Sequence, residues 1–381
     1  MINPSLDNIE LSLNEYKRYS RHLLLPQVQI EGQKRLLQAK VLCVGAGGLG
    51  APILLYLAAS GIGYITIIDE DLVDISNLQR QVIHNTSYLN SSKVESAENY
   101  IQKLNPNCTV KTYKTKLNQY NITDLVKEHD IIDDGSDNLE TRYLIDEYRY
   151  YLRKQWVYGA IFQFEGQVSV FNYQGGPSYR DIYPAGTTRV SNLSCAEGGV
   201  LGILPGLIGT LQATEALKIL LGIGDILSGQ LLIVNTLNLQ FKKLKIRQNL
   251  DLPIQAKQSN YTDQEIGDLD SSVIDEVYLS TLLKEDLVTL IDVRSPIEFT
   301  IDKIPGGLNY PLQLFYNINT LKTLAQFDKV IVLYCSLDSR SRIASAILED
   351  ANIACKRLKN GIYAWHQKQA QQSYSKQLNK K

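Results

Sequence analysis

A glycine-rich turn between a strand and a helix constrains this chain more than any other feature. Residues 45–50 read GAGGLG, directly after the apolar segment Lys40–Val44 and directly before the helical segment Ala51–Ser60. Glycines at this spacing let the backbone approach a phosphate, and the helix N-terminus supplies N–H donors. The next apolar segment ends at Asp69, where a carboxylate typically binds a ribose. The sequence therefore predicts a nucleotide-binding α/β domain.

Strand and helix patterns continue to alternate along the chain. Ile65–Ile68 and Asp130–Asp133 read as strands, while Lys93–Leu104 and the charged stretch Glu15–Leu25 read as helices. Gln167–Asn172 alternates polar and apolar residues, which is typical of a half-exposed antiparallel strand. We therefore expect an α/β fold, a Rossmann-like doubly wound sheet extended by antiparallel strands.

A change of composition divides the chain into two domains. Residues 249–272 are polar, aperiodic and poor in large apolar side chains, so we interpret them as a linker. We assign residues 1–248 to the nucleotide-binding domain and residues 273–381 to a smaller α/β domain. In the latter, Val288–Val293 and Lys329–Tyr334 read as short buried strands.

Charged groups downstream of the glycine turn favour adenylation over hydride transfer. Lys93 begins a predicted helix, and the carboxylate cluster DDGSDN (133–138) ends a predicted strand. When a carboxylate attacks the α-phosphorus of ATP, charge builds on the phosphoryl oxygens and needs cationic groups and Mg²⁺. Mg²⁺ prefers few carboxylates together with phosphate oxygens and water, which makes Asp137 its natural ligand. On the glycine turn and Asp69 alone, an NAD-binding enzyme is the alternative.

Six segments between residues 15 and 247 resemble the MoeB/ThiF family, adenylating enzymes related to ubiquitin activation. Both their order and their spacing hold. The segments are RYSRH (18–22), GAGGLG (45–50), DEDLVDISNLQRQVIH (69–84), SKVESA (92–97), DDGSDN (133–138) and GGVLGILPGLIGTLQATEALK (198–218).

This resemblance implies roles for individual residues and a homodimer in which Arg80 reaches into the partner's site. Arg80, Lys93 and Asp137 would take part in catalysis, with Asp137 holding Mg²⁺. The alternatives are solvated surface roles for Arg21 and Arg80 and a helix N-cap for Asp137. The residues implied to bind ATP are Arg21, Gly45, Gly47, Gly48, Gly50, Asp69, Ser76, Asn77, Leu78, Gln79, Arg80, Lys93, Asp137 and Asn138.

The zinc site common in this family lacks its ligands here. Such sites use two CxxC pairs. Ser178 and Asp181 stand where the first pair is expected, and no cysteine follows Gln248 where the second is expected. We predict no zinc site, and we expect the loop at residues 175–195 to be less tied down than in relatives.

Cys195 lies in the polar segment NLSCAEGG (192–199) ahead of a predicted helix. A partly exposed thiol at a helix start has a lowered pKa. By resemblance, Cys195 matches a cysteine that bonds covalently to a carrier protein. The alternative is a small buried apolar residue.

Three segments in the second domain resemble a rhodanese domain: LIDVRSPIEF (290–299), IPGGLN (304–309) and LKNGIYAW (358–365). Cys335 falls between a predicted strand and a predicted helix, where loop N–H groups stabilise a thiolate and then a persulfide. Arg340 adds positive charge. The related phosphatase loop places its arginine one residue later, at Ser341 here, so sulfur transfer is favoured. The alternative is a buried cysteine in an inactive domain.

The two resemblances together imply one pathway. The first domain adenylylates the C-terminal Gly-Gly carboxylate of a small ubiquitin-like sulfur carrier, and a persulfide on Cys335, loaded by a donor such as a cysteine desulfurase, supplies sulfur. We interpret the carrier as the molybdopterin-synthase small subunit, for molybdenum cofactor biosynthesis. Thiamine-pathway and tRNA-thiolation carriers are alternatives. A NAD-binding redox protein and a non-catalytic scaffold are alternatives from other classes.

Composition sets the expected compartment. A net charge of −1 favours neither nucleic acid nor membrane surfaces, and no apolar run reaches the roughly 18–20 residues of a membrane span. Five widely spaced cysteines favour a reducing compartment. Abundant Ile, Asn, Lys and Tyr are typical of an AT-rich genome such as an organelle's. We expect a soluble protein of the cytoplasm, or of the chloroplast stroma if the gene is organelle-encoded.

Overall fold

The computed structural model describes residues 6, 9–184, 199–248, 273–336, 339–366 and 368. The chain forms two units, Met1–Val190 with Gly198–Leu252 and Ser191–Glu197 with Pro253–Lys381, and each unit has its own sheet. The expected linker 249–272 and Cys195 lie outside the described residues, so the domain boundaries stay a prediction.

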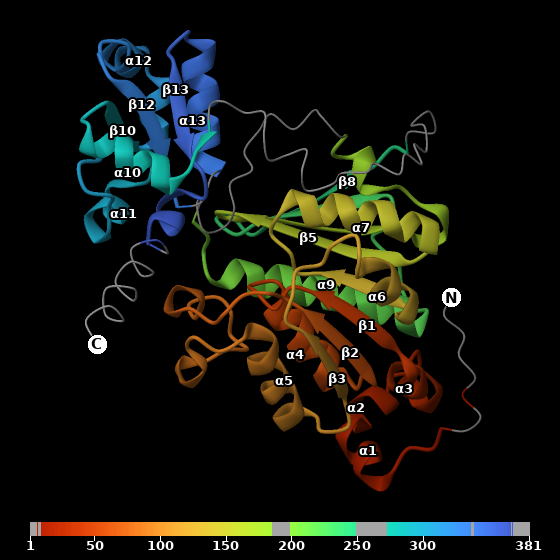
Figure 1. Cartoon of the computed structure of the whole chain (residues 1–381). Coiled ribbons are helices and arrows are strands. Elements are labelled where there is room, and N and C mark those ends of the chain that lie inside the picture. The colour runs from red at the N-terminus through yellow and green to blue at the C-terminus, as the bar shows by residue number, and fades with distance from the viewer. Residues whose placement is uncertain are drawn as a thin grey trace, which may run out of the picture. The chain divides into compact units, whose positions relative to one another are not determined.

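The first unit contains an eight-stranded sheet in the order β3-β2-β1-β4-β5-β6-β7-β8 (Figure 1). Strands β3 to β5 pair in parallel, and β5 to β8 pair antiparallel. The predicted doubly wound sheet with an antiparallel extension is confirmed. Because chain order reverses between β1 and β4, a ligand crevice is expected at their carboxyl ends. The strands are β1 (Lys40–Val44), β2 (Tyr64–Ile68), β3 (Thr109–Tyr113), β4 (Ile131–Asp134), β5 (Gln155–Phe162), β6 (Glu165–Phe171), β7 (Gln230–Asn235) and β8 (Gln240–Lys245).

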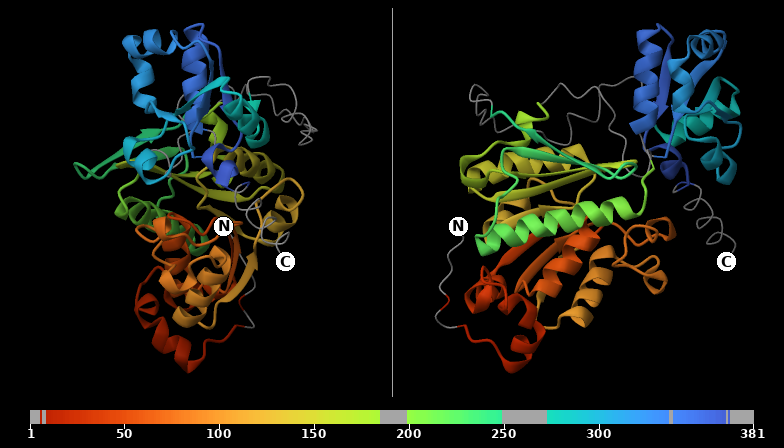
Figure 2. Two further views of the ribbon diagram at one scale, coloured as in Figure 1. Left: turned by 60° about the vertical axis from the view of Figure 1, so that its left-hand side comes forward. Right: turned by 180° about the vertical axis from the view of Figure 1, so that it is seen from behind.

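Helices cover both faces of this sheet (Figure 2). Side chains alternate between the faces along a strand, so Val41 and Cys43 join one apolar core while Leu42 and Val44 join the other. The first core is closed by α3 (Gln29–Gln38), α4 (Gly50–Ser60), α5 (Lys93–Leu104) and α9 (Ile203–Leu221). The second is closed by α6 (Ile122–Glu128) and α7 (Leu139–Leu152).

The predicted helix Glu15–Leu25 is wrong as a single element. The structure has α1 (Leu13–Arg18) and α2 (Ser20–Leu23), separated by Tyr19, whose φ of −97° and ψ of 11° leave the helical region. The Tyr19 ring is buried, and its hydroxyl accepts a hydrogen bond from Asn105 Nδ2 at 2.9 Å. The interruption of the helix thus coincides with a buried, hydrogen-bonded tyrosine.

The second unit is a five-stranded parallel sheet in the order β11-β10-β12-β13-β9, which confirms the smaller α/β domain. Strand β12 ends directly before Cys335, and α13 begins at Ser339. The strands are β9 (Val273–Ile274), β10 (Val288–Asp292), β11 (Leu308–Asn309), β12 (Val330–Tyr334) and β13 (Cys355–Leu358). The helices are α10 (Glu276–Lys284), α11 (Pro296–Ile301), α12 (Ile318–Leu324) and α13 (Ser339–Asp350).

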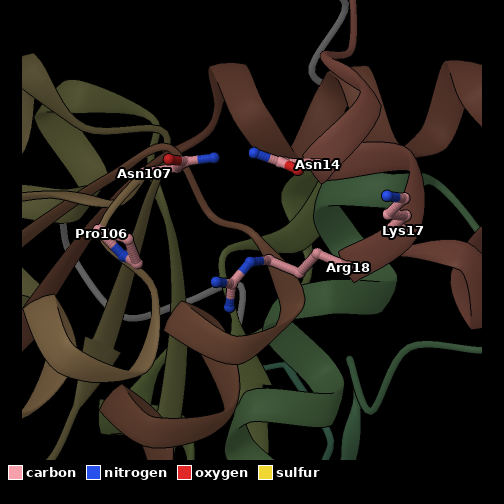
Figure 3. Close-up of a pocket in the computed structure, with 5 residues that line it drawn as sticks. All are labelled: Asn14, Lys17, Arg18, Pro106 and Asn107. Atoms are coloured by element: carbon pink, nitrogen blue, oxygen red, sulfur yellow. The ribbon is translucent and has the colours of Figure 1, made fainter.

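A cavity of about 550 Å³ in the first unit is lined by Asn14, Lys17, Arg18, Pro106 and Asn107 (Figure 3). Pro106 and Asn107 precede β3, so the cavity lies at the amino edge of the sheet. The glycine turn follows the carboxyl end of β1, at the opposite edge. This cavity is therefore separate from the predicted nucleotide site.

In the part of the chain that the structure describes, no helix is both long enough and apolar enough to cross a bilayer.

Candidate functional site

The glycine turn after β1 packs directly against the loop after β4. Gly45 has a φ of +94°, and a Cβ there would lie 2.9 Å from the carbonyl oxygen of Gly135. A Cβ on Gly50 would lie 2.0 Å from the carbonyl oxygen of Gly45. Only glycine fits these positions. The structure thus brings the glycine turn to the loop that carries Asp137, at the carboxyl edge of the sheet.

Both backbone polar groups of Ala46, its N–H and its carbonyl oxygen, have hydrogen-bond partners. Its N–H donates to Asp69 Oδ2 at 2.8 Å, and the other Asp69 oxygen accepts the N–H of Asp71 at 2.8 Å. A carboxylate oxygen has a second lone pair, so Asp69 retains acceptors for a ribose. The Ala46 carbonyl oxygen lies 2.9 Å from Nε2 of His84, a buried residue to which the sequence analysis gave no role.

The segment after β2 folds over the glycine turn. The N–H and Oγ of Ser76 both donate to Asp74 Oδ1, and Asn77 Oδ1 accepts the N–H of Asp74. These side chains therefore shape the turn in this structure. Arg80 donates to the Ser76 carbonyl at 2.8 Å, and its Cδ lies 3.8 Å from where a Cβ on Gly48 would stand. Arg80 thus lies at the glycine turn of its own chain.

Leu78 and Gln79, which were also predicted to bind ATP, lie in different surroundings. Gln79 packs against Gly202, at the start of α9, closely enough that a Cβ on that glycine would lie 2.4 Å from Gln79 oxygens. Leu78 is half-buried. The amide of Gln81, which was not predicted, lies 3.7 Å from a Cβ built on Gly47.

Lys93, the first residue of α5, is a buried cation with one counter-ion. Its Nζ lies 2.7 Å from Asp71 Oδ2, and its side chain is 7% exposed whereas that of Asp71 is 63% exposed. The Lys93 N–H also donates to the Asp71 carbonyl at 3.0 Å. Since Asp71 faces solvent, an anionic ligand can approach the same ammonium group.

Asp137 is exposed, and its carboxylate makes no hydrogen bond or ion pair among the described residues. The helix-capping alternative belongs to its neighbour instead, because Asn138 Oδ1 accepts the Thr141 N–H at 2.9 Å. A single exposed carboxylate beside a glycine turn fits a Mg²⁺ ion that takes its other ligands from phosphate and water.

Arg21 is not brought to the glycine turn of its own chain. Its neighbour His22 bonds Gln33, which donates to the carbonyl of Ser60 at the C-terminal end of α4. The glycine turn lies at the other end of this 11-residue helix, about 16 Å away. The structure therefore places the segment of Arg21 away from the glycine turn of its own chain, and the phosphate contact of Arg21 stays a prediction.

A buried polar cluster lies just behind the Asp137 loop. Asp133 and Asp134 are both fully buried at the end of β4. Gln212 Nε2 of α9 donates to Asp133 Oδ1 at 3.3 Å and to the Asp134 carbonyl at 2.8 Å. Asp133 Oδ2 has no hydrogen-bond partner among the described residues. Burial, together with the charge of Asp134, raises the pKa of Asp133 well above its usual range.

We expect Asp133→Asn to stabilise the fold at neutral pH by about 1–3 kcal/mol. A carboxyl group whose pKa is raised by folding stabilises the native state below its unfolded pKa, 3.8, and loses that contribution as the pH rises. Asparagine is neutral throughout, so the gain should shrink towards pH 4. Calorimetric Tm values between pH 4 and 8 measure this. Asp130→Asn, at the start of the same strand, is the control, and no gain for Asp133→Asn at pH 7 contradicts the prediction.

The positions where zinc-binding cysteines were expected bond to each other. The N–H and Oγ of Ser178 donate to Asp181 Oδ2 at 2.6 and 2.9 Å. Between them, Tyr179 is buried among aromatic rings, and Arg180 pairs with Asp146 of α7 at 2.6 Å. Residues 178–181 are therefore held by contacts within the chain, while residues 185–195, including Cys195, lie outside the described residues. The expectation that this loop is less tied down than in relatives stays a prediction. The absence of a zinc site stays a prediction.

In the second unit, Cys335 is buried at the carboxyl end of β12. Its Sγ lies 3.5 Å from Ser341 Oγ, and its carbonyl accepts the N–H of Ile362 at 2.9 Å. Arg340 bonds both oxygens of Glu298 at 2.8 Å and Ser336 Oγ at 2.9 Å. The predicted positive charge of Arg340 is thus paired with a carboxylate, and the two residues tie the Cys335 loop to α11.

Glu298 of α11, the partner of Arg340, is a residue that the sequence analysis missed. Burial alone would raise its pKa, but hydrogen bonds from Arg340 and Ser295 outweigh that effect and lower the pKa to about 2. The signal was available, because Ser295 and Glu298 form a capping box at the start of α11.

We expect Glu298→Gln to destabilise the second unit by about 1–3 kcal/mol at neutral pH, because it removes a bidentate pair. A depressed carboxyl pKa contributes stability above the unfolded pKa of 4.5, and this is lost as the pH falls through about 2. The variant and the wild type should therefore converge in acid. Hydrogen exchange of the α11 and α13 amides in the full chain measures this. Glu285→Gln, at an exposed residue, is the control, and equal protection in both variants contradicts the prediction.

Comparisons with known proteins agree with this architecture. The ThiF family matches residues 19–253 and the rhodanese-like domain matches residues 276–368. A probable molybdopterin-synthase adenylyltransferase of Pyropia yezoensis is 46% identical over 371 residues, covering 96% of this chain and 97% of the relative. A probable adenylyltransferase/sulfurtransferase, MoeZ, of Mycobacterium tuberculosis is 41% identical over 369 residues, covering 93% and 94%.

A solved structure supports the fold of the first unit. The crystal structure of Escherichia coli MccB with ATP matches with a TM-score of 0.54 and 18% identity, covering 66% of this chain and 76% of that one. The long matches at over 40% identity, together with a glycine turn, a buried lysine and an exposed aspartate at one sheet edge, lead to one conclusion: the chain belongs to the ThiF family and carries a C-terminal rhodanese-like domain.

Proposed function

We propose that the first unit is an ATP-dependent adenylyltransferase that activates the C-terminal glycine carboxylate of a small sulfur-carrier protein. The observation that carries this proposal is the packing of the glycine turn against the loop that carries the exposed Asp137, with Asp69 bonded to the turn and the Lys93–Asp71 pair two residues further along the chain. The names of the relatives support it, including a sulfur carrier protein adenylyltransferase of Thermus thermophilus at 44% identity over 245 residues.

In the proposed reaction, a carboxylate oxygen of the carrier attacks the α-phosphorus of ATP, and pyrophosphate leaves. Lys93 and Arg80 hold phosphate oxygens, the glycine turn supplies backbone N–H groups, and Asp69 accepts from the ribose. When bound at Asp137, Mg²⁺ would neutralise charge on the phosphates.

The second unit is proposed to supply sulfur. A persulfide on Cys335, loaded by a donor such as a cysteine desulfurase, attacks the acyl-adenylate, and AMP leaves. The resulting acyl disulfide is cleaved when a thiolate attacks Cys335 Sγ, which releases the carrier thiocarboxylate and leaves a disulfide at Cys335. A second thiol then reduces this disulfide and regenerates the Cys335 thiol. Cys195 is proposed to take part in a disulfide or thioester intermediate.

The preferred carrier is the molybdopterin-synthase small subunit, and the name of the relative from Pyropia yezoensis, a probable molybdopterin-synthase adenylyltransferase, supports this choice. We also propose a homodimer. Arg21 lies about one α4 length from its own glycine turn, so a phosphate contact by Arg21 would require a second copy of the chain.

ATP–pyrophosphate exchange with the full chain and Mg²⁺ tests this proposal. The molybdopterin-synthase small subunit, a thiamine-pathway carrier and a tRNA-thiolation carrier are added in turn, each beside a form that lacks its C-terminal glycine. Exchange that requires one intact carrier supports the proposal and identifies the substrate. Folded protein that binds ATP but catalyses no exchange with any carrier would overturn it in favour of a scaffold. Binding of NADH that ATP does not compete away would favour a redox protein.

A further inference from the structure

Three parts of the proposed phosphate site meet at one buried imidazole. His84 Nε2 lies 2.9 Å from the carbonyl oxygen of Ala46 in the glycine turn. Its Nδ1 lies 3.0 Å from Oγ of Ser96, which is on α5 one turn after Lys93. His84 itself follows Arg80 by four residues in the segment that covers the glycine turn. The ring therefore joins all three parts.

The contacts of His84 fix its tautomer. A carbonyl oxygen only accepts hydrogen bonds, so Nε2 must carry the proton that is donated to Ala46. Nδ1 is then the acceptor, and the Ser96 hydroxyl donates to it. Burial lowers the pKa of His84, and although the bond to Ala46 opposes this, the nearby Lys93 charge adds to it. The neutral ring, with one donor and one acceptor, matches this setting at neutral pH.

The glycine turn needs such support because its own residues supply few constraints. Glycines lose more conformational freedom on ordering than other residues, and four of the six residues in this turn are glycine. The side chain of Ala46 has no polar atom. The Asp69 carboxylate holds the Ala46 N–H at 2.8 Å, and His84 holds its carbonyl oxygen. Loss of either contact releases one side of the turn.

We propose that His84 is a positioning residue, which fixes the glycine turn in its phosphate-binding conformation through the Ala46 carbonyl and is braced by Ser96 of the Lys93 helix. The inference rests on the proposed function in that ATP is taken as the ligand. The proposed role of His84 requires a hydrogen-bond donor at the Nε2 position, and variants that keep or remove this donor can test it.

Two amide variants separate the two contacts of the ring. In His84→Gln the side-chain amide nitrogen reaches about as far as Nε2, so it still donates to Ala46. In His84→Asn the amide reaches only about as far as Nδ1, so it still contacts Ser96 but releases Ala46. Calorimetric titration of the full chain with Mg²⁺ and ATP gives Kd, and hydrogen exchange without nucleotide reports on residues 45–50.

We expect His84→Asn to raise the Kd for ATP about tenfold and to speed exchange at residues 45–50, because a displaced contact residue weakens a preorganised site. His84→Gln should stay within about threefold of the wild type in both measurements. A merely structural role would lower the Tm of both variants without separating their Kd values.

Equal Kd values for ATP and equal hydrogen exchange in the two variants would overturn this inference but not the proposed function. If His84→Asn does not fold, His84→Gln carries the test, because a Kd raised about tenfold in that variant would also overturn the inference. Wild-type protein that binds no ATP would overturn the proposed function and this inference together.

Discussion

Replacement of Lys93 by alanine is expected to lower carrier-dependent ATP–pyrophosphate exchange by about 10²–10³-fold, the usual effect of removing one preorganised group that stabilises transition-state charge. The Lys93 side chain is 7% exposed at the start of α5, and its Nζ pairs with Asp71, two residues after the Asp69 that holds the glycine turn. A cation held away from water acts more strongly on a developing phosphoryl charge than one in solvent. The reduction should therefore appear in kcat as well as in KM.

The fold should tolerate this substitution. Removing Lys93 leaves Asp71 without its partner, but the Asp71 side chain is 63% exposed, so water can solvate the remaining charge. Loss of exchange with an unchanged Tm would then report on chemistry and not on folding.

Lys103→Ala provides the matched control for Lys93→Ala. Lys103 lies on the same helix, in its last turn, and is exposed. It should keep wild-type exchange. Exchange in Lys93→Ala that stays within a factor of about three of the wild type would remove Lys93 from the catalytic group.

Local sequence signals predicted the backbone of this site well. The glycine turn and the ends of β1, β2 and β4 follow from short apolar runs that stop at Gly45, Asp69 and the Asp133 cluster, and the structure shows this architecture. The predicted start of a helix at Lys93 also agrees with the structure, where α5 begins at this residue. Such features depend on neighbours within a few residues, so they can be read directly from the chain.

Features that depend on distant contacts were missed. Tyr19, at the break between α1 and α2, is buried and accepts a hydrogen bond from Asn105, which lies 86 residues away. The role of His84 depends on Ala46, 38 residues earlier, and the position of Arg21 depends on the packing of α2 near Ser60. Because tertiary packing decides which polar groups meet, the segment pattern around these residues did not indicate their contacts.

The segment at residues 178–181 shows how a loop can be held by contacts within the chain. The bond between Ser178 and Asp181 closes the turn, and Asp146 of α7 accepts from the Tyr179 N–H at 2.9 Å and from Arg180 at 2.6 Å. The buried Tyr179 ring adds apolar contact. These interactions fix the segment to α7, the helix that begins directly after Asn138.

Cys335→Ala is expected to abolish thiocarboxylate formation on the carrier, by at least about 10³-fold, while ATP–pyrophosphate exchange stays within about twofold of the wild type. The thiol is the proposed sulfur carrier, and no neighbouring group replaces its chemistry. The adenylation site that we propose consists of Lys93, Asp137 and the glycine turn, all of which belong to the first unit and its separate sheet. The two half-reactions should therefore separate in this variant.

Cys355→Ala is the matched control, because it removes a thiol from the same sheet. Burial raises the pKa of Cys355 to about 11, so at neutral pH it offers almost no thiolate to accept sulfur. Incubation with a persulfide donor, followed by mass spectrometry, should find one added sulfur atom on the wild type and on Cys355→Ala but none on Cys335→Ala. If Cys335→Ala still formed carrier thiocarboxylate at the wild-type rate, sulfur would have to reach the acyl-adenylate from outside the rhodanese-like domain, and the domain would then serve to bind the donor.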